Sequence, residues 1–296
     1  MLKNVACLTL AASSVVACGG HIADVSDDGG VDGAQPISDD SGPPPPGFDG
    51  GQLDASPLPP PPQVDHRGYV VLEATLDSHT YAGASFFDQA APECAFMAPT
   101  SGCAIQTCPA NGAQQSAGII TIRGGTQDVT LTPTPNGATG VQYKAFDASG
   151  ILFQDGSTLT ITGQGDVVPA FQGSVVFPSA ISVTAPTIST TQPTLIDTSA
   201  DLAIGWSGAT TGQTLFYLQS DAGNGSFVSL GCFFDASAEK AIVPSALLRS
   251  FKALVTNPQN TYVLVFPSAR ATVVTGRWGV ELFAVGQGPL GQASLR

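Results

Sequence analysis

Short stretches in which apolar residues alternate with threonine or serine recur along the chain from residue 68 onward, and they decide its fold class. The alternation is clearest in 129–132, 158–162 and 181–184, where valine, leucine or isoleucine occupies every second position. A period of two places the apolar side chains on one face of a β-strand. The whole chain holds only four Glu, a residue typical of exposed helix faces. We therefore expect an all-β body.

Turn signals separate these strands at a spacing of roughly ten residues. Asn136-Gly137 is one such signal, because Asn-Gly adopts the positive backbone angles of tight hairpins at little cost. Many short strands at this spacing are typical of β-sandwiches, in which each sheet covers one face of the other. We expect two sandwich lobes, formed by residues 68–185 and residues 186–296.

The second of these lobes carries a pattern of aromatic residues. The run 201–206 ends in Trp206 and is followed by 215–218, an Asn-Gly turn and 227–230. This order resembles the early strands of immunoglobulin-like and fibronectin type III sandwiches, in which a strand ending in Trp precedes one that bears an aromatic residue. The resemblance implies that Trp206 is a core residue rather than a platform for a sugar ring.

One short helix is expected among the strands of the second lobe. Residues 244–251 combine apolar and helix-forming residues, and Pro244 lies at the first turn, where its missing N–H is not needed. We expect the chain to close with strands at 262–266, 271–275 and 277–285.

The first residues of the chain have the order of a secretory signal. Lys3 precedes an apolar run at 5–17 that only hydroxyl residues interrupt. At ~1.5 Å per residue the run would span ~20 Å, which is too short for a hydrocarbon core of ~30 Å. We therefore expect a signal peptide at residues 1–17 and no membrane-spanning segment.

The end of this run resembles the lipobox of bacterial lipoproteins, with aliphatic Val15, small Ala17 and then Cys18. The resemblance implies transfer of a diacylglycerol to the Cys18 thiol, cleavage before Cys18, and acylation of the new amine by a palmitate-like chain. Acyl chains contribute ~0.8 kcal/mol for each buried CH₂ group, so the implied partner is a lipid membrane. Gly19 rather than Asp favours the outer membrane, on its periplasmic face or at the cell surface. Cleavage without lipid is the alternative.

Residues 18–67 have the composition of a disordered stalk. They contain two runs of four Pro, at 43–46 and 59–62, and few apolar side chains, which show no period. Such a segment cannot offset the backbone entropy that folding costs, and its Pro runs favour an extended chain. We expect the stalk to hold the body away from the membrane.

The charge of the protein argues against nucleic acid as a partner. The formal net charge is −13, and nine Asp against one Arg fall within residues 18–67. Proteins that bind DNA or RNA present clustered Lys and Arg to the phosphates, and neither part of this chain offers such a face.

Four cysteines remain in the body after removal of the signal, and an even number outside the cytoplasm predicts two disulfides. Three pairings are possible, and every one of them joins the last cysteine to the first lobe. Zinc is the alternative, but the spacing lacks a paired Cys-x-x-Cys, so we expect no metal. The disulfide candidates are Cys94, Cys103, Cys108 and Cys232.

No constellation of catalytic residues stands out, and we expect neither a catalytic site nor a cofactor. His79 follows Asp77 and Ser78, but neighbouring residues in a strand point to opposite faces, so the three do not form a triad by themselves. Two carboxylate pairs could serve a glycan hydrolase if each spanned a cleft. These pairs are Asp197 with Asp201 and Asp155 with Asp166.

The chain as a whole resembles uncharacterised envelope lipoproteins of myxobacterial type. The resemblance rests on the lipobox, the stalk, the order of the four body cysteines, and the segment 243–248. It implies a location in the cell envelope and no mechanism.

An anchor, a spacer and a folded body together favour a non-enzymatic binding or adhesion module that meets an envelope protein or polysaccharide. Phe86, Phe87, Phe96 and Met97 are candidate contact residues, with packing in the core as the alternative. Two other functions stay open, a glycan-acting hydrolase that uses the Asp pairs and a structural component of a surface coat.

Overall fold

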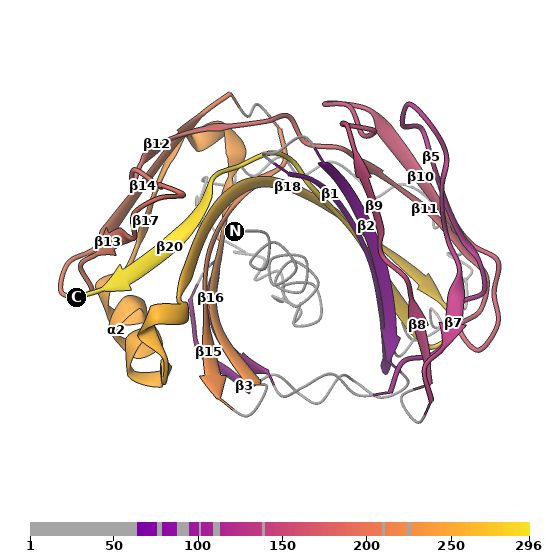
Figure 1. Cartoon of the computed structure of the whole chain (residues 1–296), viewed down its shortest axis with the longest axis horizontal. Coiled ribbons are helices and arrows are strands. Elements are labelled where there is room, and N and C mark those ends of the chain that lie inside the picture. Colours follow the sequence, from indigo (N-terminus) through magenta and orange to yellow (C-terminus); the bar gives the residue numbers. More distant parts are fainter. Residues whose placement is uncertain are drawn as a thin grey trace, which may run out of the picture. The chain divides into compact units, whose positions relative to one another are not determined.

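A computed structural model describes residues 64–75, 79–87, 95–100, 102–108, 113–137, 140–208, 211–223 and 226–296 (Figure 1). Strands dominate these residues, and the prediction of an all-β body is confirmed. Within them lie one α-helix, α2 (Ser245–Leu254), and two short 3₁₀ helices, η2 (Ala236–Ala238) and η3 (Pro258–Asn260).

The largest element is a sheet of eleven strands that bends into an arch (Figure 1). Most neighbouring strands are antiparallel, but β1 runs parallel to β19, and β13 runs parallel to β20. Nine strands follow one another across the sheet in the order β3 (Ala95–Thr100), β4 (Cys103–Cys108), β16 (Ser226–Asp235), β15 (Gln213–Gly223), β18 (Tyr262–Thr275), β19 (Trp278–Val285), β1 (His66–Ala74), β2 (His79–Phe87) and β9 (Phe146–Ser149). The other two are β20 (Leu290–Leu295), which pairs with β18, and β13 (Thr194–Ile196).

Two smaller sheets lie on the outer side of the arch, one beside each limb (Figure 1). A separate two-stranded ribbon joins β7 (Pro133–Pro135) to β8 (Val141–Tyr143). The first outer sheet has the order β11 (Phe171–Val176), β10 (Thr158–Gly163), β5 (Ile120–Arg123) and β6 (Val129–Leu131). The second has the order β12 (Ser182–Ala185), β14 (Leu202–Ser207) and β17 (Lys240–Val243).

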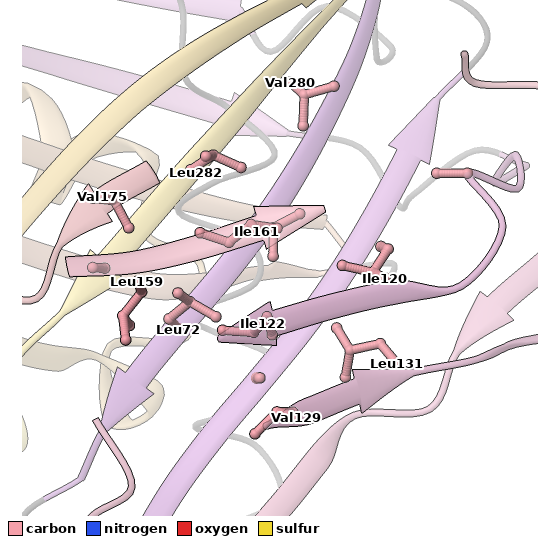
Figure 2. Close-up of a cluster of buried hydrophobic side chains, with 14 of the residues drawn as sticks. Leu72, Ile120, Ile122, Val129, Leu131, Leu159, Ile161, Val175, Val280 and Leu282 are labelled. Carbon is pink, nitrogen blue, oxygen red and sulfur yellow. The ribbon is translucent and has the colours of Figure 1, made fainter. Parts of the chain in front are cut away.

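The first core lies between the arch and the four-stranded outer sheet (Figure 2). Leu72, Val280 and Leu282 of the arch meet the alternate apolar residues of the outer sheet, among them Ile122 and Ile161. Two of these outer strands, β6 and β10, contain runs in which the sequence shows the period of two, and the residues between their buried ones are exposed or half-buried. The sandwich prediction holds for this pair of sheets.

The second core lies beneath the three-stranded outer sheet and α2. Trp206 is buried there, donates its indole N–H to the Ala236 carbonyl at 2.7 Å, and stacks on Phe234 with 6.1 Å between ring centres. The prediction that Trp206 is a core residue is confirmed. The predicted helix is present as α2. Pro244 directly precedes its first residue, and Leu247 lies on its buried face.

The two predicted lobes share the large sheet and are not independent sandwiches. Strands β1 and β2 come from the first lobe, yet β1 pairs with β19 along its length. Strand β4 also comes from the first lobe and pairs with β16. The predicted boundary between residues 185 and 186 therefore crosses a continuous sheet, although it nearly separates the two outer sheets.

Three details of the predicted elements differ from the structure. The first strand of the body, β1, begins at His66, two residues before the predicted start at residue 68. The Asp65 carboxylate just before it forms an ion pair with Arg277. The predicted strands 262–266 and 271–275 form one continuous strand, β18. The final strand, β20, was not predicted.

Candidate functional site

A third buried cluster lies on the inner side of the arch, and it differs from the other two cores in its construction. The first and second cores each combine the large sheet with an outer sheet, whereas every described member of the third cluster comes from the large sheet itself. We call this set the inner-face cluster. Its buried members are Tyr69, Val71, Phe87, Leu215, Tyr217, Leu264, Phe266, Phe283 and Val285.

The alternation of side chains along each strand builds this cluster. In β1, Val70 and Leu72 belong to the first core, so Tyr69 and Val71 point to the opposite face. In β15, Phe216 and Leu218 belong to the second core, and the alternate residues Leu215 and Tyr217 join the inner-face cluster. The arch is therefore apolar on both faces.

Charged and phenolic side chains lie beside the apolar part of the cluster. The register places Tyr69 of β1 opposite Glu281 of β19, and it places Glu73 of β1 opposite Tyr81 of β2. Burial of the Tyr69 hydroxyl, followed by the nearby Glu281 carboxylate, raises the pKa of Tyr69 to about 12, although the Arg67 guanidinium opposes the shift. The part of the inner face that β1, β2 and β19 form therefore combines aromatic rings with charges of both signs.

Tyr217 is a second deeply buried phenol of the inner face, with a relative exposure of 3%. Its ring lies over Gly231 of the neighbouring strand β16, since a Cβ added at Gly231 would sit 3.5 Å from the Tyr217 ring. Burial raises the pKa of Tyr217 above its ordinary range, and the Ser229 hydroxyl opposes the shift. A Cβ at that distance would be in ordinary van der Waals contact, so the Tyr217 ring packs directly beside Gly231.

The second half of β18 borders the cluster with exposed side chains. Arg270, Thr272 and Val274 alternate with residues that pack on the first core, so they lie on the inner face of the sheet. The Arg270 guanidinium lies 5.3 Å from the centre of the Phe233 ring, within the range of a cation–π interaction. Val274 is 47% exposed. The buried cluster therefore continues into a row that solvent reaches.

Aromatic side chains and Arg, both present on the inner face, are among the residue types that are enriched at protein interfaces. Strand backbones fix the spacing of the side chains, which keeps the surface preformed.

The sequence contains a signal for this face that is independent of any catalytic motif. Residues 69–72 and 215–218 are uninterrupted apolar runs, in contrast to the alternating runs of the outer sheets. An uninterrupted run is typical of a strand whose two faces are both covered.

The first carboxylate pair considered for hydrolysis performs local structural roles. The Asp197 carboxylate accepts hydrogen bonds from the backbone N–H and the hydroxyl of Ser199, at 2.9 and 2.7 Å. The Asp201 carboxylate accepts a hydrogen bond of 2.8 Å from the backbone N–H of Ser245, the first residue of α2. These hydrogen bonds lower the pKa of both carboxyl groups, which favours a permanent negative charge over the role of a general acid.

The second pair and the histidine are likewise spread over the surface. The Asp155 carboxylate accepts a hydrogen bond of 3.0 Å from the backbone N–H of Ala180, and Asp166 lies in an exposed turn. The Nδ1 atom of His79 lies 3.1 Å from Asp147 on the neighbouring strand β9, in an exposed position. Asp77 and Ser78 lie outside the described residues.

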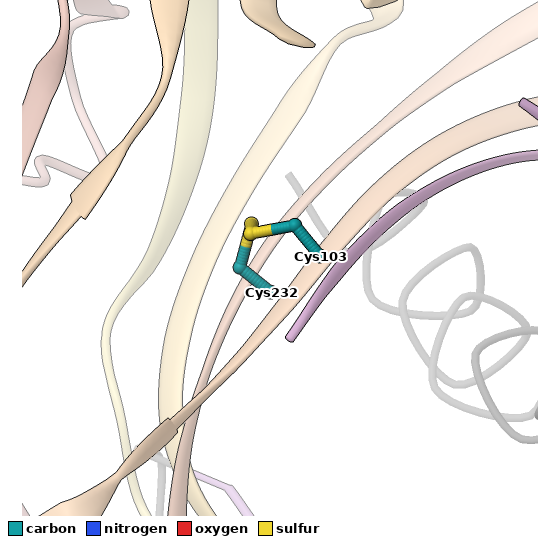
Figure 3. Close-up of a disulfide and its surroundings, with 2 residues drawn as sticks. All are labelled: Cys103 and Cys232. Carbon is teal, nitrogen blue, oxygen red and sulfur yellow. A yellow bond between two sulfur atoms is a disulfide. The ribbon is translucent and has the colours of Figure 1, made fainter. Parts of the chain in front are cut away.

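A disulfide joins Cys103 of β4 to Cys232 of β16 (Figure 3). It links the first half of the body to the second. Such a link was expected, because every possible pairing of the four cysteines joins Cys232 to the first lobe. Cys94 and the side chain of Cys108 lie outside the described residues, as do the signal peptide, Cys18 and the stalk up to residue 63.

Two of the four candidate contact residues are core residues. Phe86 is fully buried in the first core, where its ring meets Tyr143 edge-on with 5.7 Å between centres. Phe87 is the next residue of β2 and belongs to the inner-face cluster. The side chains of Phe96 and Met97 lie outside the described part of the chain.

Within the described ranges, no three His, Cys, Asp or Glu residues gather in a way that could hold a metal ion. In the same part of the chain, the structure contains no helix of the length and apolar character that a membrane crossing requires.

Comparison with known proteins adds no relative. No protein-family profile matches the chain, and no curated protein shows significant similarity to it.

Proposed function

We propose that this protein is a membrane-anchored envelope lipoprotein whose body binds an apolar segment of another envelope protein on the inner side of the arch. The observation that supports this proposal most is the construction of the inner-face cluster, whose described members all come from one sheet. The two other cores already pair the arch with an outer layer. Each of those sandwiches uses only the outer face of the arch, so neither requires the inner face to be apolar.

The composition of the inner face favours a polypeptide ligand over a polysaccharide. Its aromatic rings lie among aliphatic side chains such as Val71 and Leu215, which match the apolar side chains of a peptide but offer a sugar no hydrogen-bonding group. A protein interface has such an apolar centre, together with polar groups at its rim. Arg270 and Thr272 lie where that rim is expected, as exposed residues on the inner face.

The anchor and the stalk supply the reason for a tethered binder. Lipid on Cys18 would hold the chain at the membrane, and the stalk, predicted at residues 18–67, would let the body reach a partner at a distance. Tethering raises the effective concentration of the body near other envelope proteins, so an interface of modest affinity is sufficient.

The hydrolase alternative receives less support from the site. The Asp155, Asp197 and Asp201 carboxylates each accept a hydrogen bond from a backbone N–H. Such a carboxylate caps a turn or a helix, and the hydrogen bond would have to break before the group could transfer a proton to a substrate.

A pair of photo-crosslinking variants of the full-length, membrane-processed protein tests the proposal. A photoreactive amino acid at Val274 reports on the inner face, and the same residue at Val176 of β11 is the matched control, since the two side chains are 47% and 49% exposed. We expect a discrete adduct with one envelope protein from position 274 and none from position 176.

The same experiment separates the remaining functions. Equal labelling from both positions, or no adduct from position 274, would overturn the inner face as the binding site. Adducts between copies of this chain would favour the structural coat instead. The intact mass of the membrane-extracted protein checks the anchor independently, since it should equal residues 18–296 plus acyl groups.

A further inference from the structure

We infer that Tyr217 and Gln219 form a polar subsite on the inner face, which binds a peptide group of the partner segment. The inference rests on the proposed function and adds the chemistry by which the inner face recognises its ligand. It begins with two polar atoms of strand β15. The Tyr217 hydroxyl and the Gln219 Oε1 atom are both buried, and neither has a hydrogen-bond partner among the residues that the structure describes.

Both side chains point to the inner side of the arch. Side chains alternate along a strand, and Phe216 and Leu218 of β15 belong to the second core on the outer side. Tyr217 and Gln219 therefore share the opposite face, with about 7 Å between their positions along the strand. The register places Gln219 opposite Tyr262 of β18, which packs against the inner-face cluster. The two polar atoms thus lie together at the apolar surface of the proposed interface.

Tyr143 shows how a buried phenol is satisfied within this fold. Its hydroxyl accepts a hydrogen bond of 2.7 Å from the Ala117 N–H and donates one of 2.8 Å to the Gly118 carbonyl. The Tyr217 hydroxyl is buried to a similar extent without either bond. The neighbouring Ser229 hydroxyl opposes the rise in the pKa of Tyr217, but the two groups do not meet in the geometry of a hydrogen bond. Because buried polar groups are normally hydrogen-bonded, Tyr217 is suited to a partner from outside the fold.

The two atoms define the group that would complement them. The Gln219 Oε1 atom can only accept a hydrogen bond, and a phenol hydroxyl can donate one. A ligand that satisfies both atoms therefore brings one donor and one acceptor, close together, to an otherwise apolar surface. A peptide group has this composition, with one N–H and one C=O. The partner segment would donate an N–H to Gln219 and accept a hydrogen bond from Tyr217.

The surroundings of the pair favour a peptide group over a sugar. Leu215 precedes Tyr217 on the same face of β15, and Leu264 lies opposite Tyr217 on β18. A sugar carries hydroxyls around its ring, and most of them would lose their hydrogen bonds to water against these leucine side chains. An apolar peptide segment instead places hydrophobic side chains between its polar groups, so it can fill the cluster and satisfy the isolated pair together.

Two matched phenol variants of the full-length, membrane-processed protein test the first half of the inference. Tyr217→Phe removes a hydroxyl that lacks a partner in the fold, whereas Tyr143→Phe removes one that has two. In the purified protein without its partner, we expect Tyr143→Phe to lower the urea midpoint and Tyr217→Phe to leave it unchanged or raise it. A similar decrease in both variants would show that the Tyr217 hydroxyl is satisfied within the protein, and would overturn the subsite.

Photo-crosslinking from position 274 tests the second half. Loss of one hydrogen bond should lower the yield of the adduct about 2- to 10-fold in Tyr217→Phe, and by a similar factor in Gln219→Leu. Tyr143→Phe lies in the first core and should keep the yield of the wild type under conditions in which it stays folded. The binding and stability effects of the two phenol variants are therefore opposite, which a purely structural role of Tyr217 would not produce.

Two small isosteric probes test the peptide group itself. N-methylhexanamide and methyl hexanoate share their apolar chain and carbonyl, but only the amide has an N–H. We expect the amide to suppress the adduct at lower concentration than the ester does, and the difference to vanish in Gln219→Leu. Equal suppression by the two probes, or an adduct that Tyr217→Phe and Gln219→Leu leave unchanged, would overturn the subsite while the proposed function stands. Absence of the adduct in the wild type would overturn both.

Discussion

Cys103 and Cys232 are 129 residues apart in the sequence and are covalently joined between neighbouring strands of the arch. Cys103 lies in β4, near the edge of the large sheet, and Cys232 lies in β16, which continues the sheet toward its centre. Both sulfur-bearing side chains are buried in the second core. The bridge thus joins the two halves of the chain inside the sheet that they share.

Removal of this disulfide should lower the free energy of unfolding. In the chain-entropy model, a loop of more than a hundred residues contributes about 5 kcal/mol, and measured losses are often smaller. We expect the variant with both Cys103→Ala and Cys232→Ala to lose about 2–5 kcal/mol in urea unfolding at neutral pH.

The matched control for this variant is the single change Cys232→Ala. It breaks the same bridge and leaves a free Cys103 thiol, so its stability should lie close to that of the double variant. An unchanged urea midpoint in both variants would show that the bridge does not constrain the unfolded chain.

The stability of the protein should fall at high pH because of its buried tyrosines. Burial, as the largest cause, raises the pKa of Tyr69 to about 12, above the ordinary value of a tyrosine. The unfolded chain therefore releases the proton first, and the associated stability is fully present below pH ~10 and is lost as pH rises toward ~12. Two pKa units correspond to about 3 kcal/mol of lost stability.

Urea unfolding between pH 8 and pH 12, together with tyrosinate absorbance, measures this effect. Tyr69→Phe keeps the ring and removes the ionisable group, so its stability should fall less steeply over the same interval. Burial also raises the pKa of Tyr143 and Tyr217, and both should contribute to the remaining slope. A slope that Tyr69→Phe leaves unaltered would contradict the assignment to Tyr69.

The sequence was sufficient to predict the class of the fold and several of its local elements. Period-two alternation predicted strands such as β10, and Pro244 predicted the start of α2, because both signals depend on residues close together in the chain. The role of Trp206 as a core residue followed from the aromatic pattern around it.

The pairing of distant strands could not be predicted in the same way. Strand β1 lies beside β19, with His66 opposite Trp278, and nothing in either segment specifies the other as its neighbour. Choice of partner depends on packing across the whole sheet, which local periodicity does not report. For this reason the sequence did not indicate that strands of both predicted lobes would share one large sheet.

The inner-face cluster was missed because it is spread over distant strands. Tyr69 and Tyr217 lie 148 positions apart in the chain, and neither belongs to a catalytic or metal-binding motif. The uninterrupted apolar runs that contain them indicated strands covered on both faces, but not that these faces would meet on one side of an arch.

The Trp206 indole should stabilise the second core through its hydrogen bond as well as through the apolar surface that it buries. The N–H donates to the Ala236 carbonyl at 2.7 Å, and both residues are buried. Trp206→Phe keeps an aromatic ring but leaves that carbonyl without its donor, so we expect a loss of about 1–3 kcal/mol in urea unfolding.

The fluorescence of the second tryptophan supplies the control for this variant. Trp278 lies in the first core and should report the same unfolding midpoint as circular dichroism if the arch unfolds as one unit. Two separate midpoints in Trp206→Phe would show that the second core unfolds independently of the first.

Two glycines with positive φ offer a matched test of the close approach between strands. Gly124 has φ +99° at the end of β5, and a Cβ there would overlap the Thr158 carbonyl oxygen of β10. Gly156 has φ +75°, and a Cβ there would have no atom within 4 Å. Alanine at either position incurs the conformational cost of about 1–2 kcal/mol, because an L side chain disfavours this backbone region.

Only Gly124→Ala should incur a further loss from displacement of β10. The clash is with backbone, which a side-chain rotation cannot relieve, and the displaced strand carries Leu159 and Ile161 of the first core. We expect Gly124→Ala to unfold at a clearly lower urea concentration than Gly156→Ala, and to expose apolar surface that binds a hydrophobic dye. Equal midpoints for the two variants would mean that β5 and β10 can separate locally without cost to the core, and that the four-stranded outer sheet is less rigid than its packing indicates.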